Sequence, residues 1–599
     1  MIESAPQGMS APRWDLSDLF AGVDDPAWQK SLEGCLVDAL SFQARYRGTI
    51  SVPGGPSAED LRTGLDIYEG LLDRSSRAQA FARLLYAGDS TNDDHRALVA
   101  RADSFATDMR NHLLFFDLEW LLVSEADGER LMADPALKKY ASHLRRERLF
   151  LPHKLNEDEE KIANEKDLTG RRAWTKLFAE VTGALSFVLD DDGTPHTVTL
   201  AEVLARFQHP RRDVRRAAHD VLYGTLEGQS SVLTYIYDTL VQDHLTMDRL
   251  RKFPDPMRER HLTNNVPPDA VEQMMTVVEE GYGVAQDYFV AKAAMLGIEK
   301  LTIYDQYAPI GVPLPPTRFD EARTIVLDAF AAFHPRFEQL GAEFFDRRWI
   351  DAEIRPGKRN GAFCAYPSPH VHPYILANYT GNRRDVMTIA HELGHGIHGQ
   401  LARGQHFFDF HAPLPLAETA SVFAEMLVFD RVLAREKSPE ARRALTAGMV
   451  ENIFATVFRQ TVLTRFEQSV YRARQGGRLT SEEISRHWLA ANAPYYGEAL
   501  EMSHGYRLGW SYIPHFINSR FYCYAYTFGE LLVLALYALY RERGAAFIPD
   551  YIALLERGGA MPPADALRLL DVDINDAAFW RKGMSEIQRM TAMVVTRGE

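Results

Sequence analysis

The amino-acid sequence predicts a mainly α-helical protein with a small amount of β-structure. Ala, Leu, Arg and Glu dominate residues 1 to about 185, and β-branched residues are few there. Apolar residues recur at helical spacing, as at Phe81, Leu84 and Leu85. Helical patterns dominate again after residue 400. With 599 residues, the chain is long enough for several domains or for one large multi-lobed protein.

In chain order, the first change of character comes at residues 187–199. Asp192-Gly193 is a tight-turn dipeptide between two short stretches with strand character. We therefore predict a small β-hairpin here. We take the hairpin as the boundary between an N-terminal helical domain, residues 1–200, and a second domain, residues 201–599.

The region 354–380 has few helical patterns. Residues 357–363 form a turn-rich loop, and residues 374–379 are a short strand candidate. The edge of such a strand could pair with the backbone of an extended peptide. A structural strand whose edges are covered is the alternative, and the sequence does not decide between the two.

A predicted helix from Met387 to Leu401 contains the sequence His391-Glu-Leu-Gly-His395. An α-helix turns once in about 3.6 residues, so both imidazoles lie on one face and can hold a metal ion. Glu392 falls where it can meet a water bound to that metal. The pattern H-E-x-x-H is a zinc-hydrolase signature.

A zinc ion in a hydrolytic site usually takes three protein ligands, so the motif needs a third. A metzincin would continue with Gly at 398 and His at 401, but the chain has His398 and Leu401. Glu418 and Glu425 lie seven residues apart in an apolar helical segment, hence on one face. Because a buried acid is costly unless it is paired or binds metal, we predict Glu418 as the third ligand. Glu425 is then the expected partner of the other N–H of a ligand histidine.

Four other histidines lie near the motif in sequence. His406 and His411 stand in loop-like stretches and are competing ligand candidates. His370 and His372 flank a loop close to the predicted strand. For these two, contact with a substrate or simple exposure to solvent is the expected role.

The charge and the cysteines restrict the class of partner. A formal net charge of −15 argues against a nucleic-acid ligand, which requires clustered Lys and Arg. Three widely spaced cysteines form no disulfide framework, and the N-terminal residues show no secretory signal. The most apolar run, residues 531–540, is about half of a membrane span. We therefore expect a cytoplasmic protein with no membrane partner.

Six segments spread along the chain match one known family. They are residues 14–20, 166–174, 357–363, 391–398, 418–425 and 513–516 with the tyrosines that follow. Together they are far more specific than H-E-x-x-H alone. On these segments the chain resembles the M3 family of zinc metallopeptidases, in its oligoendopeptidase F branch.

The resemblance implies a fold, a metal and a substrate. It implies a mainly α-helical zincin-type metallopeptidase with two lobes that flank a deep central channel, and a small β-sheet near the metal helix. The channel would admit short peptides and exclude folded proteins, and the N-terminal domain would restrict access to it. His391, His395 and Glu418 would hold one Zn²⁺ per chain, with Glu392 as the general base. A histidine and tyrosines on a late segment would face the substrate.

The late segment offers hydrogen-bond donors for an oxyanion, which forms when water attacks an amide. The candidates are His515, Tyr522, Tyr524 and Tyr526. Tyr524, nine residues after His515, matches the family best, whereas Arg520 and Thr527 occupy positions where some relatives carry Tyr. Core packing is the alternative role for two of the three tyrosines.

These features predict a zinc-dependent endopeptidase that hydrolyses short oligopeptides. A peptidyl carboxypeptidase or dipeptidyl carboxypeptidase is the alternative, and it needs a cation for the terminal carboxylate. Lys358, Arg507 and Arg520 are the candidates for that cation. An inactive helical peptide-binding protein is a further alternative. The sequence makes no prediction of cleavage preference or of oligomeric state.

Overall fold

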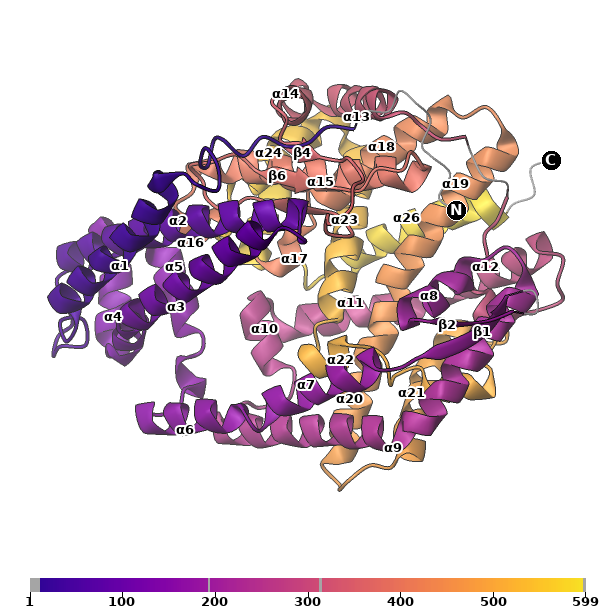
Figure 1. Cartoon of the computed structure of the whole chain (residues 1–599), viewed down its shortest axis with the longest axis horizontal. Coiled ribbons are helices and arrows are strands. Elements are labelled where there is room, and N and C mark those ends of the chain that lie inside the picture. The colour runs from indigo at the N-terminus through magenta and orange to yellow at the C-terminus, as the bar shows by residue number, and fades with distance from the viewer. Residues whose placement is uncertain (1–10, 192–193, 312–314, 596–599) are drawn as a thin grey trace. The chain divides into compact units, whose positions relative to one another are not determined.

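The computed structural model describes residues 11–191, 194–311 and 315–595, and it is mainly helical, as the sequence predicts (Figure 1). Its residues form two compact units. The first unit comprises Met1–Leu151, Leu314–Arg435 and Leu539–Val572. The second comprises Pro152–Pro313, Glu436–Ala538 and Asp573–Glu599. The sequence-based division into residues 1–200 and 201–599 assigns a different role to each part, and this assignment stays a prediction. In the described ranges no helix has the length and apolar character that crossing a bilayer requires.

The first unit begins with three helices that pack against one another around a shared aromatic core. Each is started by a side-chain cap, from Asp25, Ser57 and Asn92 respectively, which accepts a backbone N–H of the first turn. Two shorter helices follow. The bounds are α1 (Pro26–Tyr46), α2 (Ala58–Gly88), α3 (Asp93–Leu122), α4 (Glu125–Met132) and α5 (Ala141–Arg148).

The rest of the first unit surrounds a small three-stranded sheet with the order β4-β6-β5. Its strands are β4 (Ile350–Asp351), β5 (Phe363–Ala365) and β6 (Tyr374–Leu376). β6 pairs with β4 in parallel and with β5 in antiparallel fashion. The strand predicted at residues 374–379 is therefore the shorter, central β6, and the idea that its edge accepts a peptide is wrong because both edges are paired. A small sheet beside the metal helix is confirmed, since β5 and β6 both contact α15 (Arg383–Leu401).

The turn-rich loop at residues 357–363 is hydrogen-bonded to the connection between α2 and α3, and so links this connection to the sheet. Ser90 N–H donates to the carbonyl of Gly357 at 2.7 Å. Lys358 is buried, and its Nζ donates to the carbonyls of Asp351, Glu353 and Ala377 at 2.6–3.0 Å. The Asp351 carboxylate lies 2.7 Å from the same nitrogen. Lys358 is thus a buried structural cation.

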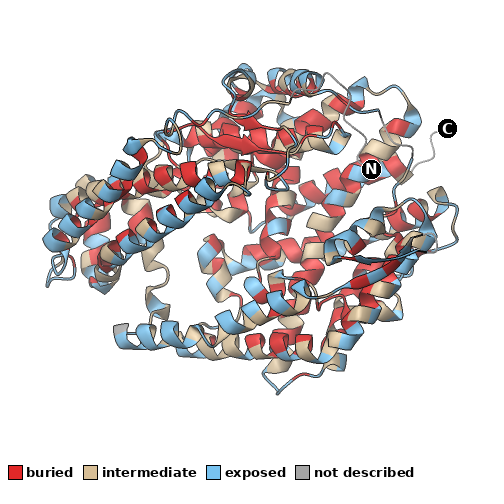
Figure 2. Ribbon diagram, viewed as in Figure 1, coloured by how far each residue is buried: buried red, intermediate tan, exposed pale blue. Residues whose placement is uncertain are grey.

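The helix α15, whose residues are mostly buried, packs against four helices of the first unit (Figure 2). They are α13 (Phe319–Phe333), α14 (Pro335–Asp346), α18 (Ser421–Arg435) and α24 (Ile548–Glu556). The unit also contains the short helices α16 (Phe407–Phe410), α17 (Leu414–Ala417) and α25 (Pro563–Leu567). The helix α23 (Tyr524–Arg543) is shared, because its residues up to Ala538 belong to the second unit.

The second unit is also mainly helical. Its helices are α6 (Glu157–Asp167), α7 (Arg171–Gly183), α8 (Leu200–Ala205), α9 (Arg212–Leu250), α10 (Arg258–Asn264), α11 (Pro268–Glu280), α12 (Tyr282–Met295), α19 (Pro439–Thr456), α20 (Phe458–Arg474), α21 (Ser481–Tyr496), α22 (His515–Asn518) and α26 (Ala577–Val595). Capping boxes stabilise the starts of two of these helices, at Asn156 before α6 and at Thr480 before α21.

The predicted hairpin is confirmed in the second unit. β1 (Phe187–Asp191) pairs with β2 (Thr194–Val198) in antiparallel fashion, with Phe187 opposite Val198. The Asp192-Gly193 turn itself lies outside the described residues. A second pair, β3 (Leu301–Thr302) with β7 (Leu500–Glu501), is parallel and two residues long.

Gly394 sits where α15 approaches the backbone that leads into α18. A Cβ at this position would lie 2.4 Å from the carbonyl oxygen of Ala420 and 2.5 Å from the Cα of Ser421. These are backbone atoms that cannot rotate away. Gly396 similarly leaves room for the ring of Phe344. The two glycines therefore set how closely α15 is packed.

We predict that Gly394→Ala destabilises the protein by about 1–3 kcal/mol, because the added methyl overpacks a backbone contact. Thermal and denaturant unfolding measure the loss. Gly70→Ala is the matched control, since nothing lies within 4 Å of a Cβ built at this position in α2. The control should leave stability unchanged or raise it by up to about 1 kcal/mol. Equal stability of the two variants would contradict the close approach at Gly394.

Candidate metal centre

The helix α15 carries the H-E-x-x-H residues and is fixed at its start and along its buried face. The Asn382 side chain accepts the N–H of Asp385 at 2.9 Å, so the helix begins at Arg383, four residues before the predicted start. Ile389, Leu393 and Ile397 are buried in the core of the first unit. The opposite side of the helix presents His391 and His395.

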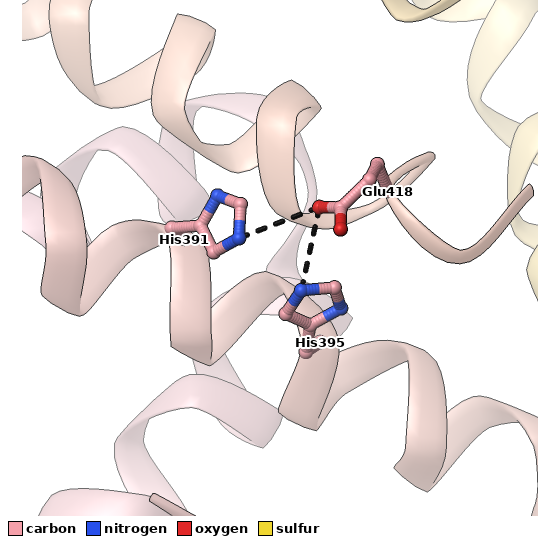
Figure 3. Close-up of side chains that lie close together, drawn as sticks. All are labelled: His391, His395 and Glu418. Carbon is pink, nitrogen blue, oxygen red and sulfur yellow. Dashed lines mark ion pairs between the residues drawn. The ribbon is translucent and has the colours of Figure 1, made fainter. Parts of the chain in front are cut away.

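Three ligand-type atoms converge beside this helix (Figure 3). Nε2 of His391 and Nε2 of His395 each lie 3.4 Å from Oε2 of Glu418. All three atoms lie within 4.8 Å of one another, and in the described parts of the chain this is the cluster of His, Cys, Asp and Glu that could hold a metal. The structure thus brings together the three residues that the sequence singles out as candidate ligands, and their binding of a metal stays a prediction.

The spacing fits a tetrahedral zinc ion. Zinc bonds to imidazole nitrogen and carboxylate oxygen are about 2.0–2.2 Å long, which puts neighbouring ligand atoms about 3.3–3.5 Å apart in a tetrahedron. Two imidazoles and one carboxylate are also the donor set of a hydrolytic zinc site, which leaves the fourth position for water. The residues present therefore fit the metal.

Glu425 orients the first histidine. Its Oε1 lies 2.5 Å from Nδ1 of His391, so Nδ1–H donates to the carboxylate and Nε2 points toward Glu418. This is the contact the sequence predicts for Glu425. Nδ1 of His395 is buried and has no hydrogen-bond partner among the described residues. In the described part of the chain, a carboxylate therefore holds Nδ1 of His391 but not Nδ1 of His395.

Glu418 stands in a turn between α17 and α18, not within one continuous helix with Glu425 as the sequence suggests. Ser421 Oγ donates to Oε2 of Glu418 at 2.6 Å. The turn itself is held by Tyr551 of α24, whose hydroxyl donates to the carbonyl of Thr419 at 2.8 Å. No sequence pattern points to Ser421 or Tyr551, because each acts through a contact specific to this fold.

The charges in the cluster stabilise positive charge at His391. Burial alone would lower the pKa of His391, but the hydrogen bond and charge of Glu425 and the charge of Glu418 raise it to about 9. Burial would raise the pKa of Glu418, yet the two histidines lower it to about 2. An environment that favours protons on these nitrogens also favours a divalent cation. The electrostatics agree with the geometry.

Glu392 lies next to the cluster on α15 and is 6% exposed. Burial raises the pKa of its carboxyl group, while the nearby charges of His391 and His395 act in the opposite direction. It is a buried carboxyl group adjacent to both imidazoles. This is the environment expected of a group that exchanges a proton within the site.

The competing histidines have other contacts. His406 packs against Tyr140 and lies 3.1 Å from Asp409, and the ring of His411 packs against Tyr366. His372 stacks on Trp349 and contacts Asp18. The backbone N–H of His370 donates to the Ser368 hydroxyl. None of the four joins the metal cluster in the described residues.

The late segment lies in the second unit and forms its own cluster. Nε2 of His515, at the start of α22, lies 3.3 Å from the hydroxyl of Tyr526. The ring of Tyr522 is centred 5.9 Å from that of His515 and 5.2 Å from that of Tyr526. Tyr526 is 36% exposed. His515, Tyr522 and Tyr526 therefore form a three-ring group at the surface of their unit.

Tyr524 points elsewhere. It is fully buried, and its hydroxyl accepts the side-chain N–H of Asn264 at 2.9 Å and lies 3.1 Å from Nδ1 of His261. Burial raises the pKa of this phenol. The geometry favours the core-packing role for Tyr524.

The backbone between His515 and Tyr522 is held from two sides. Phe521 has a φ of 50°, a conformation that side chains rarely adopt, and its N–H donates to Oε1 of buried Glu467 at 3.0 Å. On the other side, Arg260 of α10 donates to the hydroxyl of Ser519 at 2.8 Å. Arg260 also lies over the ring of Tyr522. Glu467 and Arg260 thus position the segment, and sequence reasoning missed both.

Comparison with known proteins places these residues in a family context. The model for peptidase family M3 matches residues 323–586, which contain the metal cluster and the late segment, and the model described as oligopeptidase F matches residues 119–187. Oligopeptidase PepF of Bacillus subtilis is 26% identical over 94% of this chain and 83% of that protein. Group B oligopeptidase PepB of Streptococcus agalactiae is 25% identical over 97% of both.

Solved structures share the fold. A Chlamydophila abortus crystal structure described as a peptidase superimposes with a TM-score of 0.88 at 23% identity, covering 99% of this chain and 98% of that chain. Oligoendopeptidase-F from Enterococcus faecium superimposes with a TM-score of 0.70 at 22% identity, covering 94% and 97%.

We predict that Glu425→Ala lowers the affinity for zinc by about 10–100-fold, because His391 then loses the carboxylate that orients it. Competition with a chelator of known affinity measures the change. Glu129→Ala, an exposed acid in α4, is the control and should bind zinc like the wild type. A folded Glu425→Ala protein with unchanged affinity would contradict the orienting role.

Proposed function

Because the chain belongs to peptidase family M3, in its oligoendopeptidase F branch, we propose that it is a zinc-dependent endopeptidase that hydrolyses short oligopeptides. The proposal of zinc rests on the convergence of His391, His395 and Glu418, with His391 oriented by Glu425. The class of substrate rests on the relatives, whose names describe oligopeptidases.

In this proposal His391, His395 and Glu418 hold one zinc ion. When bound, the zinc supplies a water with a pKa of about 7 and polarises the carbonyl of the scissile amide. The carboxylate of Glu392 accepts the proton of the attacking water and then gives it to the departing amine nitrogen. Glu425 keeps Nδ1 of His391 protonated, so that Nε2 remains available as a ligand.

We propose His515, Tyr522 and Tyr526 as the hydrogen-bond donors to the oxyanion. Their mutual contacts support this role, because a hydroxyl beside an imidazole is a donor whose direction is fixed. Tyr524 is the least suited of the three tyrosines, since its hydroxyl is engaged by Asn264. We further propose that residues 1–200 restrict which peptides reach the site.

The partners in this proposal are short peptides in the cytoplasm. Cys35, Cys364 and Cys523 are free thiols, which supports a reducing compartment. The net charge of −15 supports the absence of a nucleic-acid partner.

The carboxypeptidase alternative finds little support in its candidate cations. Lys358 is buried among backbone carbonyls, as described above. Arg520 is bound by Asp248 at 2.6 Å, and Arg507 donates to Glu227. Each already has an acidic partner or a set of acceptors, which favours the endopeptidase.

Replacing Glu392 tests the base. We predict that Glu392→Gln retains one zinc per chain and lowers kcat by at least about 10²–10⁴-fold, because the amide cannot accept the proton. Zinc quantification and cleavage of a quenched fluorescent peptide provide the two measurements. Zinc-loaded variant that cleaves as fast as the wild type would exclude Glu392 as the base. Peptide binding without turnover in the zinc-loaded wild type would instead favour an inactive peptide-binding protein.

Product mapping separates endopeptidase from carboxypeptidase. We predict that a peptide with an amidated C-terminus is still cut at the same internal bond as its free-acid form. Mass spectrometry of both digests identifies the bonds. Complete loss of cleavage on amidation would favour the carboxypeptidase.

A further inference from the structure

Arg459, at the start of α20 in the second unit, is partly buried, and its partners differ from those of two buried arginines of the same unit. Arg215 is 2% exposed and pairs with Asp305 at 2.8 Å, and Arg520 is 8% exposed and pairs with Asp248. A guanidinium withdrawn from water normally has such an acidic partner. Among the described residues no carboxylate pairs with Arg459.

The hydrogen bond that Arg459 makes occupies few of the N–H donors of its guanidinium group. Nη1 donates to the hydroxyl of Tyr506 at 3.3 Å. A guanidinium has five N–H donors in a planar fork. Arg459 is only partly buried, and none of its nitrogens is a buried group without a partner. Its remaining N–H groups therefore reach solvent, where a ligand can meet them.

Tyrosine hydroxyls surround this guanidinium. Tyr506 donates to the side-chain carbonyl of Asn492 at 3.0 Å and lies 3.4 Å from the hydroxyl of Tyr496. Tyr307 and Tyr512 are close enough for the charge of Arg459 to act on their phenols. These hydroxyls are polar and uncharged at neutral pH. The acid that acts on Tyr307, Glu451, is paired with Lys292 at 2.5 Å.

The position of Arg459 links it to the late segment. Its charge also acts on Cys523, which stands between Tyr522 and Tyr524. The tyrosine-rich stretch around Tyr506 and Tyr512 leads directly into His515. α20, α21 and α9 pack together with residues 504–508 around this region.

We propose that Arg459 and the hydroxyls around it form a binding site for a carboxylate. The open edge of a guanidinium matches the two oxygens of a carboxylate, and phenolic hydroxyls add donors to the same oxygens. The carboxylate comes from the free C-terminus of a peptide or from a small carboxylate ion. The peptide source rests on the proposed function, whereas binding of a small carboxylate does not.

Binding measurements on zinc-loaded Glu392→Gln enzyme test the site, because bound peptide is then not cleaved. Isothermal titration calorimetry compares the binding of an N-acetylated peptide that has a free C-terminal carboxylate with the binding of the same peptide as its C-terminal amide. Acetate alone serves as the small carboxylate. We expect the free acid to bind about 10–100-fold more tightly than the amide, as charge-assisted hydrogen bonds do. Acetate should stabilise the protein against heat and compete with the free-acid peptide.

Arg459→Gln should remove both the preference for the free acid and the effect of acetate. Arg459→Lys keeps the positive charge but loses the planar pair of N–H donors, so it should retain part of the preference for the free acid. This variant keeps the test informative if Arg459→Gln fails to fold. Arg472→Gln, an exposed residue of the same helix, is the matched control and should behave like its parent. Circular dichroism and zinc content confirm that each variant is folded.

The outcomes separate this site from the proposed function. Free-acid preference and acetate binding that persist in folded Arg459→Gln would overturn the site and leave the peptidase standing. Equal binding of acid and amide, with no acetate effect, in the parent enzyme would also overturn the site. Acetate binding that is lost in Arg459→Gln, while neither peptide binds, would support the site and count against the peptidase.

Discussion

The close approach of α15 to the turn at residues 418–420 is the contact on which the candidate metal centre depends. Gly394 has no side chain, so the carbonyl of Ala420 can come within a distance that any other residue would forbid. Tyr551 holds the same turn from α24 through Thr419. Together these contacts bring Oε2 of Glu418 over the two imidazoles. The ligand geometry is thus a consequence of backbone packing at Gly394, the residue directly before His395.

Charge compensation distinguishes structural from functional groups in both units. Lys358 and Arg520 are withdrawn from water and fully engaged by carbonyls or carboxylates, which fits a role in holding the fold. Glu418 and Glu425 are compensated only by imidazoles, and this arrangement suits a cation that binds and is retained. Arg459 has no acidic partner among the residues that the structure describes, which is the physical reason to expect a ligand there.

Local patterns were predictable because they depend on a few neighbouring residues. The helix around His391 and the hairpin at 187–198 both follow from spacings of two to four positions. The two acids at 418 and 425 were also found, since apolar surroundings make a buried carboxylate conspicuous. Their helix was nevertheless interrupted by a turn that the pattern did not reveal. Arg459 and Glu467 gave no signal, because an isolated charged residue in a helical pattern resembles any exposed one.

Features that join distant segments were not predictable. Tyr524 matched the family spacing best, yet its hydroxyl is taken up by Asn264, 260 residues away in the chain. The strand at 374–376 became the centre of a sheet because residues 350–351 and 363–365 pair on its two sides. Burial and pairing of this kind follow from the assembled fold, which no short stretch of sequence encodes.

The candidate metal ligands come from two segments of the first unit, the helix α15 and the turn before α18. An ion bound by both would act as a reversible cross-link between them. By mass action, free metal at a hundred times its dissociation constant would stabilise the folded chain by about 2.7 kcal/mol. Loss of the metal would then expose the chain to proteolysis and would also remove its proposed activity. The abundance of the protein in a cell would follow the supply of zinc.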